Sequence, residues 1–203
     1  QSECANGVPF ARYWMHNGFI NVDRRKMSKS LGNFFTVREV AEKFGYEPIR
    51  YLMVASHYRT PINYSVEIIE QCKAALDRLY NCRERLGQVA ASGEGEADAA
   101  FLAALDGYRA RFVTAMDDDL NTADAIGVIF ELVRELNTAM GGENPSPAAA
   151  KAGLGALEEL TGVLGLLYAR NEEKSLDDEV EALIAARNEA RASKKLGRGR
   201  PHP

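Results

Sequence analysis

Apolar residues recur at spacings of three and four along most of the chain after residue 65, a pattern typical of amphipathic helices. Ser65 is expected to cap a long first helix that runs to about Ala91. Its apolar stripe consists of Ile69, Cys72, Leu76, Leu79, Leu86 and Val89. Further stripes predict helices over 101–116, 126–140 and 148–168, and a last helix from about 176. Helices of this length with short connections favour an antiparallel bundle.

The first 64 residues predict shorter elements. The apolar run 19–22 follows Gly18 and is expected to form a short strand, the one strand that the pattern predicts. Thr36 and Glu39 have the spacing of a capping box, which predicts the start of a helix. Short helices are expected over 9–17, 36–44 and 47–56, and a polar, aromatic connection over 57–64. The chain is therefore predicted to be mainly α.

Composition sets the broad class of protein. The 203 residues are 46% hydrophobic, which is enough for the core of one or two domains. No apolar run reaches about 18 residues, and the start has no secretory signal pattern. Three cysteines without C-x-x-C spacing indicate neither a disulfide framework nor a zinc knuckle. We expect a cytoplasmic protein without membrane contact, and the missing initiator Met suggests a fragment or a processed product.

Charge is distributed unevenly along the chain. Residues 1–91 carry 13 Lys+Arg and 9 Asp+Glu, a balance of +4, whereas residues 92–191 carry 8 and 20, a balance of −12. The last twelve residues carry four basic side chains and no acidic one. Acidic helices are a poor platform for polyanionic RNA. Any RNA contact is therefore expected on the first half of the chain, or on parts beyond it.

The pentapeptide K-M-S-K-S at 26–30 is the main candidate for chemistry. When a carboxylate attacks the α-phosphorus of ATP, negative charge builds on the departing pyrophosphate, and a positioned ammonium group stabilises that transition state. Lys26 and Lys29 supply such groups. Composition alone would equally fit a basic surface turn. The predicted strand before the pentapeptide and the capping box after it favour a phosphate-binding loop.

K-M-S-K-S is the signature loop of class I aminoacyl-tRNA synthetases, and the chain closely resembles the C-terminal portion of cysteinyl-tRNA synthetase, beginning just upstream of that loop. The matching stretches are 13–18, 22–23, 26–36, 56–59, 63–65, 115–122, 179–184 and 186–187. The resemblance implies the C-terminal edge of a Rossmann-type catalytic domain, with a short strand and the loop, followed by an antiparallel helical bundle. It divides the chain into a catalytic remnant (1–35), a connective segment that contacts the tRNA stem (36–64), a helical bundle of tRNA-binding type (65–168) and a truncated or altered anticodon-side region (169–203).

The resemblance also implies roles for individual residues. Lys26 and Lys29 would be catalytic, with Lys29 on ATP and Lys26 supporting the loop. Ser28 and Ser30 would belong to the ATP site. Residues 18–22, which include Val22, would lie beside the adenine through their backbone. The expected partners are tRNA(Cys), cysteine and ATP with Mg²⁺, bound by a monomer.

Tyr58 and Arg59 have two readings. Their side chains could stack on or pair with RNA, which makes them the predicted tRNA contacts of the chain. Packing at a domain corner is the alternative.

Two elements of the family do not occur in this sequence. These are the H-I-G-H element, which holds the ATP phosphates opposite the loop, and the zinc ligands that select the cysteine thiolate. Zn²⁺ is expected in the full-length family, but no metal site is expected here, and Cys4 is interpreted as structural or incidental. The run Asp117-Asp118-Asp119 fits helix capping better than Mg²⁺ binding, because adjacent carboxylates cannot share one helical face. The chain alone is expected to be inactive.

Two other functions stay open at this point. A related ligase joins cysteine to an amino-sugar in thiol biosynthesis and shares the loop, although it has no need for long helices over 98–190. The other alternative is a non-catalytic helical module that binds RNA or protein. The tail 195–203 is basic and rich in Gly and Pro, unlike the family, and a one-base frame change or a disordered RNA-binding tail would account for it.

Overall fold

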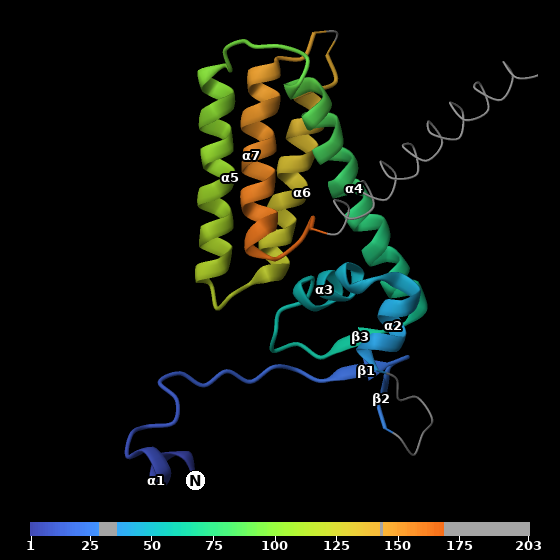
Figure 1. The fold of residues 1–203 in the computed structure, drawn as a ribbon, viewed down its shortest axis with the longest axis vertical. Coiled ribbons are helices and arrows are strands. Elements are labelled where there is room, and N and C mark those ends of the chain that lie inside the picture. The colour runs from blue at the N-terminus through green and yellow to red at the C-terminus, as the bar shows by residue number, and fades with distance from the viewer. Residues whose placement is uncertain (29–35, 143, 169–203) are drawn as a thin grey trace, which may run out of the picture. The chain divides into compact units, whose positions relative to one another are not determined.

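The computed structural model describes residues 1–28, 36–142 and 144–168. Contacts divide the chain into one compact unit, Gln1–Leu167, and a second unit, Tyr168–Pro203, of which only Tyr168 is described. The elements of the first unit are α1 (Ser2–Asn6), β1 (Ile20–Val22), β2 (Arg25–Lys26), α2 (Val37–Phe44), α3 (Tyr46–Val54), β3 (Ile62–Tyr64), α4 (Val66–Ala90), α5 (Ala99–Asp117), α6 (Thr122–Ala139) and α7 (Pro147–Val163) (Figure 1). The mainly α prediction is confirmed. The helix predicted from about 176 lies outside the described residues.

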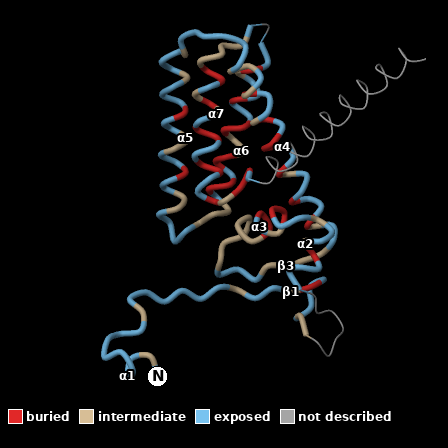
Figure 2. Tube along the Cα trace, viewed as in Figure 1, coloured by how far each residue is buried: buried red, intermediate tan, exposed pale blue. Residues whose placement is uncertain are grey.

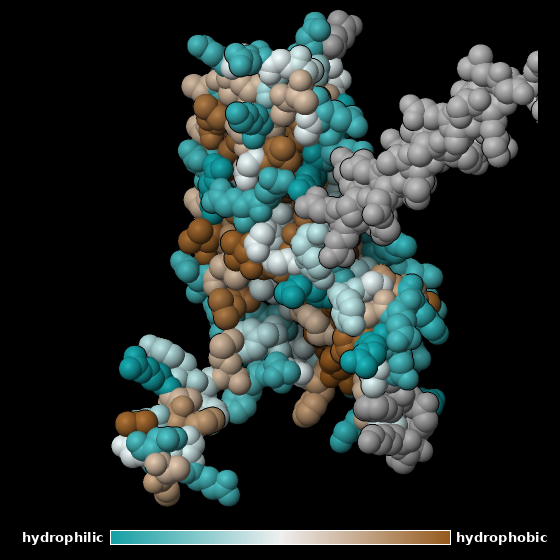
Figure 3. All heavy atoms as spheres, viewed as in Figure 1, coloured by the Kyte–Doolittle hydropathy of each residue, from teal (hydrophilic) through white to brown (hydrophobic). Residues whose placement is uncertain are grey.

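Helices α4 to α7 form an antiparallel bundle, as predicted (Figure 1). Their apolar stripes face one another, and the buried positions follow the inner sides of α4, α6 and α7 (Figure 2). The most deeply buried large side chains are Ile69, Leu79, Leu86, Leu105, Ile129, Leu132, Leu136 and Leu157. On the face drawn in Figure 3, hydrophilic and hydrophobic residues are interspersed over the outside of the bundle. None of the described helices is both long enough and apolar enough to cross a membrane.

Side-chain caps set the starts of the bundle helices. Ser65 Oγ accepts a hydrogen bond from Ile68 N at 3.3 Å, which starts α4 as predicted. Ser146 Oγ accepts from Ala149 N at 3.3 Å at the start of α7, where Pro147 occupies the first turn. These bonds satisfy backbone N–H groups that have no partner within the helix.

The prediction for 9–17 is wrong, because that segment is not helical and the helix at this end is α1. The apolar side chains of the segment, which include Tyr13 and Trp14, are exposed, so a nine-residue helix would bury no apolar face there. A helix that short is not stable without packing. The pattern also missed β2 and β3, which are too short to show alternation.

Buried Glu47, in the first turn of α3, ties three parts of the unit together. Its carboxylate accepts a hydrogen bond from Tyr80 Oη on α4 at 2.6 Å and another from Leu167 N. Arg83, also on α4, donates to Leu167 O at 3.2 Å and pairs with Glu158 of α7 at 2.8 Å. The turn that follows α7 is therefore fixed to α3 and α4.

We expect Glu47→Ala to lower the free energy of unfolding by about 1–3 kcal/mol or more, because it removes the carboxylate that accepts hydrogen bonds from the buried Tyr80 hydroxyl and from the Leu167 N–H. Urea unfolding followed by circular dichroism measures the change. Glu70→Ala, at an exposed position on α4, is the matched control and should change stability by less than about 0.5 kcal/mol. Equal losses for the two variants would contradict the role given to Glu47.

Two glycines of α7 provide a test of the bundle packing. A Cβ on Gly153 would clash with Leu136 Cδ2, whereas a Cβ on Gly155 would meet nothing within 4 Å. We expect Gly153→Ala to destabilise the protein by about 1–3 kcal/mol through overpacking. Gly155→Ala should stabilise it by about 0.5–1 kcal/mol through helix propensity. Thermal unfolding of both variants checks this, and a stabilising Gly153→Ala would show that the helices are not in close contact there.

Candidate functional site

A small sheet positions the start of the candidate loop. Its strand order is β2-β1-β3, with β1 and β2 antiparallel and β1 and β3 parallel. Asp23 and Arg24 connect β1 to β2 with φ of 48° and 62°, the positive values that two-residue hairpins favour. The side-chain oxygen of Asn63, on β3, accepts from Arg24 N at 2.6 Å, and Asp23 N donates to Tyr64 O at 3.1 Å. Strand β3 thus holds the hairpin in a conformation that Arg rarely adopts.

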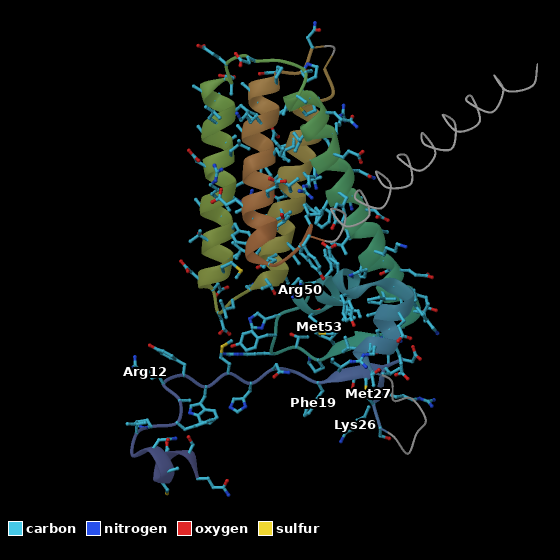
Figure 4. The ribbon with its side chains drawn as sticks, viewed as in Figure 1. Arg12, Phe19, Lys26, Met27, Arg50 and Met53 are labelled. Carbon is cyan, nitrogen blue, oxygen red and sulfur yellow. The ribbon has the colours of Figure 1, made fainter. Side chains whose placement is uncertain are left out.

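Lys26 is the last residue of β2 and is exposed, followed by half-buried Met27 and Ser28 (Figure 4). The catalytic and ATP-binding predictions for Lys29 and Ser30 fall outside the described residues. Lys26 and Ser28 are therefore the part of the predicted phosphate-binding set that the structure describes. Lys26 ends the second strand of the hairpin, and Ser28 follows two residues later.

The far side of the candidate loop ends at a fixed helix start. Thr36 Oγ1 accepts from Glu39 N at 3.3 Å, and the Glu39 carboxylate accepts from Thr36 N, so the predicted capping box is present. Hydrogen bonds from the Thr36 backbone and hydroxyl lower the pKa of Glu39. The segment between Lys26 and Thr36 is thus bounded by a hairpin strand and a capped helix.

Val22 is 6% exposed, so its side chain belongs to the core and offers no surface to a ligand. Its backbone lies in the middle strand, paired with Arg25 of β2 and with Tyr64 of β3. The pairing with β2 extends only to Asn21, opposite Lys26. Of the predicted adenine segment 18–22, residues 18–20 therefore have a backbone edge that β2 does not cover.

Gly18 lies against the connection between α3 and β3. Its N–H donates to Tyr58 O at 2.7 Å, and a Cβ would come within 2.5 Å of the carbonyl carbon of Thr60. Phe19 O accepts from Ile62 N at 2.8 Å in the same contact. No residue other than glycine fits here without displacing the backbone. The sequence pattern indicated Gly18 as a break between two elements and did not indicate this contact.

Tyr58 and Arg59 converge on Asp119, in the connection between α5 and α6. Tyr58 Oη donates to Asp119 Oδ1 at 2.8 Å, and Arg59 Nη2 lies 3.0 Å from Asp119 Oδ2. His57 Nε2 is 3.6 Å from the same carboxylate. Hydrogen bonding to Tyr58, followed by the charge of Asp119, raises the pKa of Arg59. The Arg59 side chain is still 65% exposed. It therefore pairs with Asp119 and faces solvent at the same time.

The run 117–119 has separate roles in the structure. Asp118 ends α5, Asp119 binds the 57–59 segment, and Asn121 caps α6 by accepting from Asp124 N at 3.1 Å. Asp119 adopts a φ of 55°, which Asp tolerates better than most residues. Sequence reasoning expected caps at this junction but missed the partner of Asp119, because that partner lies 60 residues away.

The cysteines of the chain do not fit a zinc site. Burial raises the pKa of Cys72 and of Cys82 to about 11, so both stay protonated, whereas zinc binds the thiolate. Cys4 is exposed. Within the described ranges, no group of three or more His, Cys, Asp or Glu side chains is arranged to hold a metal ion.

Comparison with known proteins extends this picture. Residues 1–74 match a family model of the class I tRNA synthetase (C) catalytic domain, and residues 111–168 match the DALR domain. The cysteine–tRNA ligase of Symbiobacterium thermophilum is 48% identical over 200 residues, covering 97% of this chain and 42% of that protein. That of Pseudomonas paraeruginosa is 50% identical over 199 residues, covering 96% and 41%. The chain thus spans about two-fifths of the length of these relatives.

A solved structure shares the fold at lower identity. It is the ternary complex of Agrobacterium radiobacter K84 agnB2 LeuRS with tRNA and LeuAMS, at 22% identity and a TM-score of 0.54. The match covers 74% of this chain and 22% of that one. The hairpin, the capped helix start and the bundle are therefore found in a chain whose sequence matches ligases of one kind over nearly its whole length. The chain is therefore similar to cysteine–tRNA ligases over nearly its whole length and to the class I tRNA synthetase catalytic domain over residues 1–74.

Proposed function

We propose that this chain supplies the K-M-S-K-S loop and the tRNA-side helices of a cysteine–tRNA ligase. Such an enzyme uses ATP to convert cysteine to cysteinyl-adenylate and transfers the cysteinyl group to tRNA(Cys). The observation that carries the proposal is the position of the loop, between the hairpin strand that ends at Lys26 and the helix that Thr36 caps. The identity to cysteine–tRNA ligases supports the choice of amino acid.

The chemical step determines the role that we propose for each of the two lysines. A carboxylate oxygen of cysteine attacks the α-phosphorus of ATP, a new C–O–P linkage forms, and the bond to the bridging oxygen breaks, so the electron pair leaves with pyrophosphate. Lys29 stabilises the charge on that leaving group, and Lys26 fixes the start of the loop from the end of β2. The adenine lies along the backbone edge of residues 18–20, which β2 leaves uncovered.

The match of residues 111–168 to the DALR domain supports an RNA substrate over an amino-sugar. A ligase for a small amino-sugar has no need for α5, α6 and α7. Tyr58 and Arg59 stay the proposed tRNA contacts of the connective segment, with Asp119 orienting the guanidinium group. The H-I-G-H element and the zinc ligands would come from sequence outside these 203 residues.

In a protein that joins this chain to the remainder of a class I catalytic domain, we expect Lys29→Ala to slow cysteine-dependent pyrophosphate exchange by about 10²–10³-fold. The affinity for cysteine should change much less, because Lys29 acts on the leaving group. The control is Lys73→Ala, which removes an exposed lysine of α4 and should leave exchange unchanged.

Unchanged exchange kinetics in Lys29→Ala would remove this residue from the site. The 203-residue chain by itself should give no detectable exchange, since it lacks the H-I-G-H element. Cysteine-dependent exchange by that chain would show that a complete site exists within it.

The role of Arg59 can be separated from its packing at the corner. Arg59→Gln should weaken the binding of a tRNA(Cys) transcript several-fold, because a phosphate contact is lost. Asp119→Asn keeps the tolerance for positive φ and frees the guanidinium group, so tRNA binding should stay at least as strong as in the wild type. Fluorescence anisotropy with labelled transcript measures both, with Asp118→Asn as the control. If Arg59→Gln and Asp119→Asn lower only the melting temperature and leave tRNA binding unchanged, the contact between Arg59 and Asp119 has a structural role alone.

A further inference from the structure

Tyr58 contacts two parts of the first unit that are far apart along the chain. Its backbone carbonyl accepts a hydrogen bond from Gly18 N at 2.7 Å, and its hydroxyl donates to Asp119 Oδ1 at 2.8 Å. Gly18 begins the segment proposed for the adenine, whereas Asp119 belongs to the connection between α5 and α6. A single residue therefore joins the backbone edge proposed for the nucleotide to the helical bundle.

The Tyr58 side chain is half-buried and is held on several sides. Arg59 Nε donates to its hydroxyl oxygen at 2.9 Å, so that the same oxygen accepts one hydrogen bond and donates another to Asp119. The ring stacks on His57, with ring centroids 4.8 Å apart and an interplanar angle of 25°. These contacts fix the direction of the side chain, so a displacement of Asp119 is transmitted to the Tyr58 backbone.

The connection that carries Asp119 is itself a tight turn. Asp119 and Leu120 have consecutive positive φ values of 55° and 54°, which Leu in particular rarely adopts. Leu120 N donates to Met116 O at 3.0 Å, and Asn121 N donates to Ala115 O at 3.2 Å, which closes the turn onto the last turn of α5. The bundle therefore presents the Asp119 carboxylate from a backbone whose conformation is set by hydrogen bonds.

At the other end of this connection, residues 18–20 follow the segment 58–62 closely. Gly18 leaves no space for a Cβ beside Thr60, Phe19 O accepts from Ile62 N at 2.8 Å, and Ile20 pairs with Ile62 in the parallel register. A shift of the Tyr58 backbone therefore moves the edge of residues 18–20 that β2 leaves uncovered.

We propose that Tyr58 is a positioning residue of the nucleotide site, and that Asp119 of the bundle sets its position. The proposal rests on the proposed function in one respect, since it takes the adenine to lie along residues 18–20. The bundle then affects ATP binding without touching ATP, through the Tyr58 hydroxyl, the Tyr58 carbonyl and Gly18 in turn. A ligand bound through backbone groups is sensitive to small displacements, because a hydrogen bond weakens steeply as its angle departs from linear.

The first test measures amide hydrogen exchange of the 203-residue chain by NMR, because the Gly18 N–H reports directly on its bond to Tyr58. Tyr58→Phe removes only the hydroxyl, and Asp119→Gly removes the carboxylate at a position where glycine tolerates the positive φ. Each should speed amide exchange at Gly18 by about fivefold or more, the effect of one lost hydrogen bond. Asp119→Asn keeps an acceptor for the hydroxyl and should retain most of the protection.

The second test measures cysteine-dependent pyrophosphate exchange in the protein that joins this chain to the remainder of a class I catalytic domain. No tRNA is added, so an RNA contact of Arg59 cannot contribute. Tyr58→Phe and Asp119→Gly should each raise KM for ATP about fivefold, while kcat and KM for cysteine change less than about twofold. The double variant should raise KM for ATP little further, because both changes break the same contact.

Two control variants separate positioning from stability. Tyr108→Phe removes a hydroxyl from a half-buried tyrosine of α5 that is not part of this contact. Gly153→Ala destabilises the core of the bundle and leaves Tyr58 and Asp119 in place. Both should keep amide exchange at Gly18 and KM for ATP within about twofold of the wild type, since a lower fraction of folded enzyme reduces the rate and not the affinity for ATP.

The outcomes distinguish this proposal from the proposed function. Equal amide exchange at Gly18 in the wild type, Tyr58→Phe and Asp119→Gly would overturn the proposal. Faster amide exchange with an unchanged KM for ATP would also contradict it, because Gly18 would then move without consequence for the nucleotide, and the ligase function would stand. If the wild-type joined protein shows no cysteine-dependent pyrophosphate exchange, the proposed function fails, and the amide exchange rates still test whether Asp119 holds Gly18 in place.

Discussion

The first unit depends on one buried carboxylate. Glu47 belongs to α3, yet its hydrogen bonds reach α4 through Tyr80 and the turn after α7 through Leu167. Burying a charge is unfavourable unless hydrogen bonds compensate for it, so Glu47 requires both partners to be in place. The two partners come from positions 33 and 120 residues along the chain. Helix α3 continues through residues 57–61 into β3. The hydrogen bonds of Glu47 therefore connect the end of the bundle, through α3, to the strand that supports the hairpin.

The sequence predicted the bundle well because its signals are local. Helical periodicity and caps such as Ser65 act within a few residues, and the structure places both as expected. The failed helix at 9–17 shows the limit of the same signal. Its apolar residues have helical spacing in part, but no surface of the described chain covers Tyr13 or Trp14. Periodicity reports which residues could form an apolar face, and tertiary packing decides whether that face is used.

The position of the candidate site could be predicted from the sequence, but the hydrogen bonds and ion pairs that hold its flanking residues could not. The pentapeptide and the capping box at Thr36 identify the loop because they form a contiguous pattern. The supports are long-range: Asn63 holds Arg24, and Asp119 holds Arg59. Nothing in the local sequence around any of these four residues indicates its partner.

The parallel pairing of β1 with β3 has a consequence for the order of folding. Ile20 pairs with Ile62, so the strand that steadies the hairpin is made 42 residues later. At a synthesis rate of about 5–20 residues per second, the hairpin waits roughly 2–8 s on the ribosome without its neighbour. During that interval Arg24 has no side chain of Asn63 to hold its positive φ. The hairpin before the candidate loop therefore gains its supporting strand late in synthesis, after residues 62–64 have emerged.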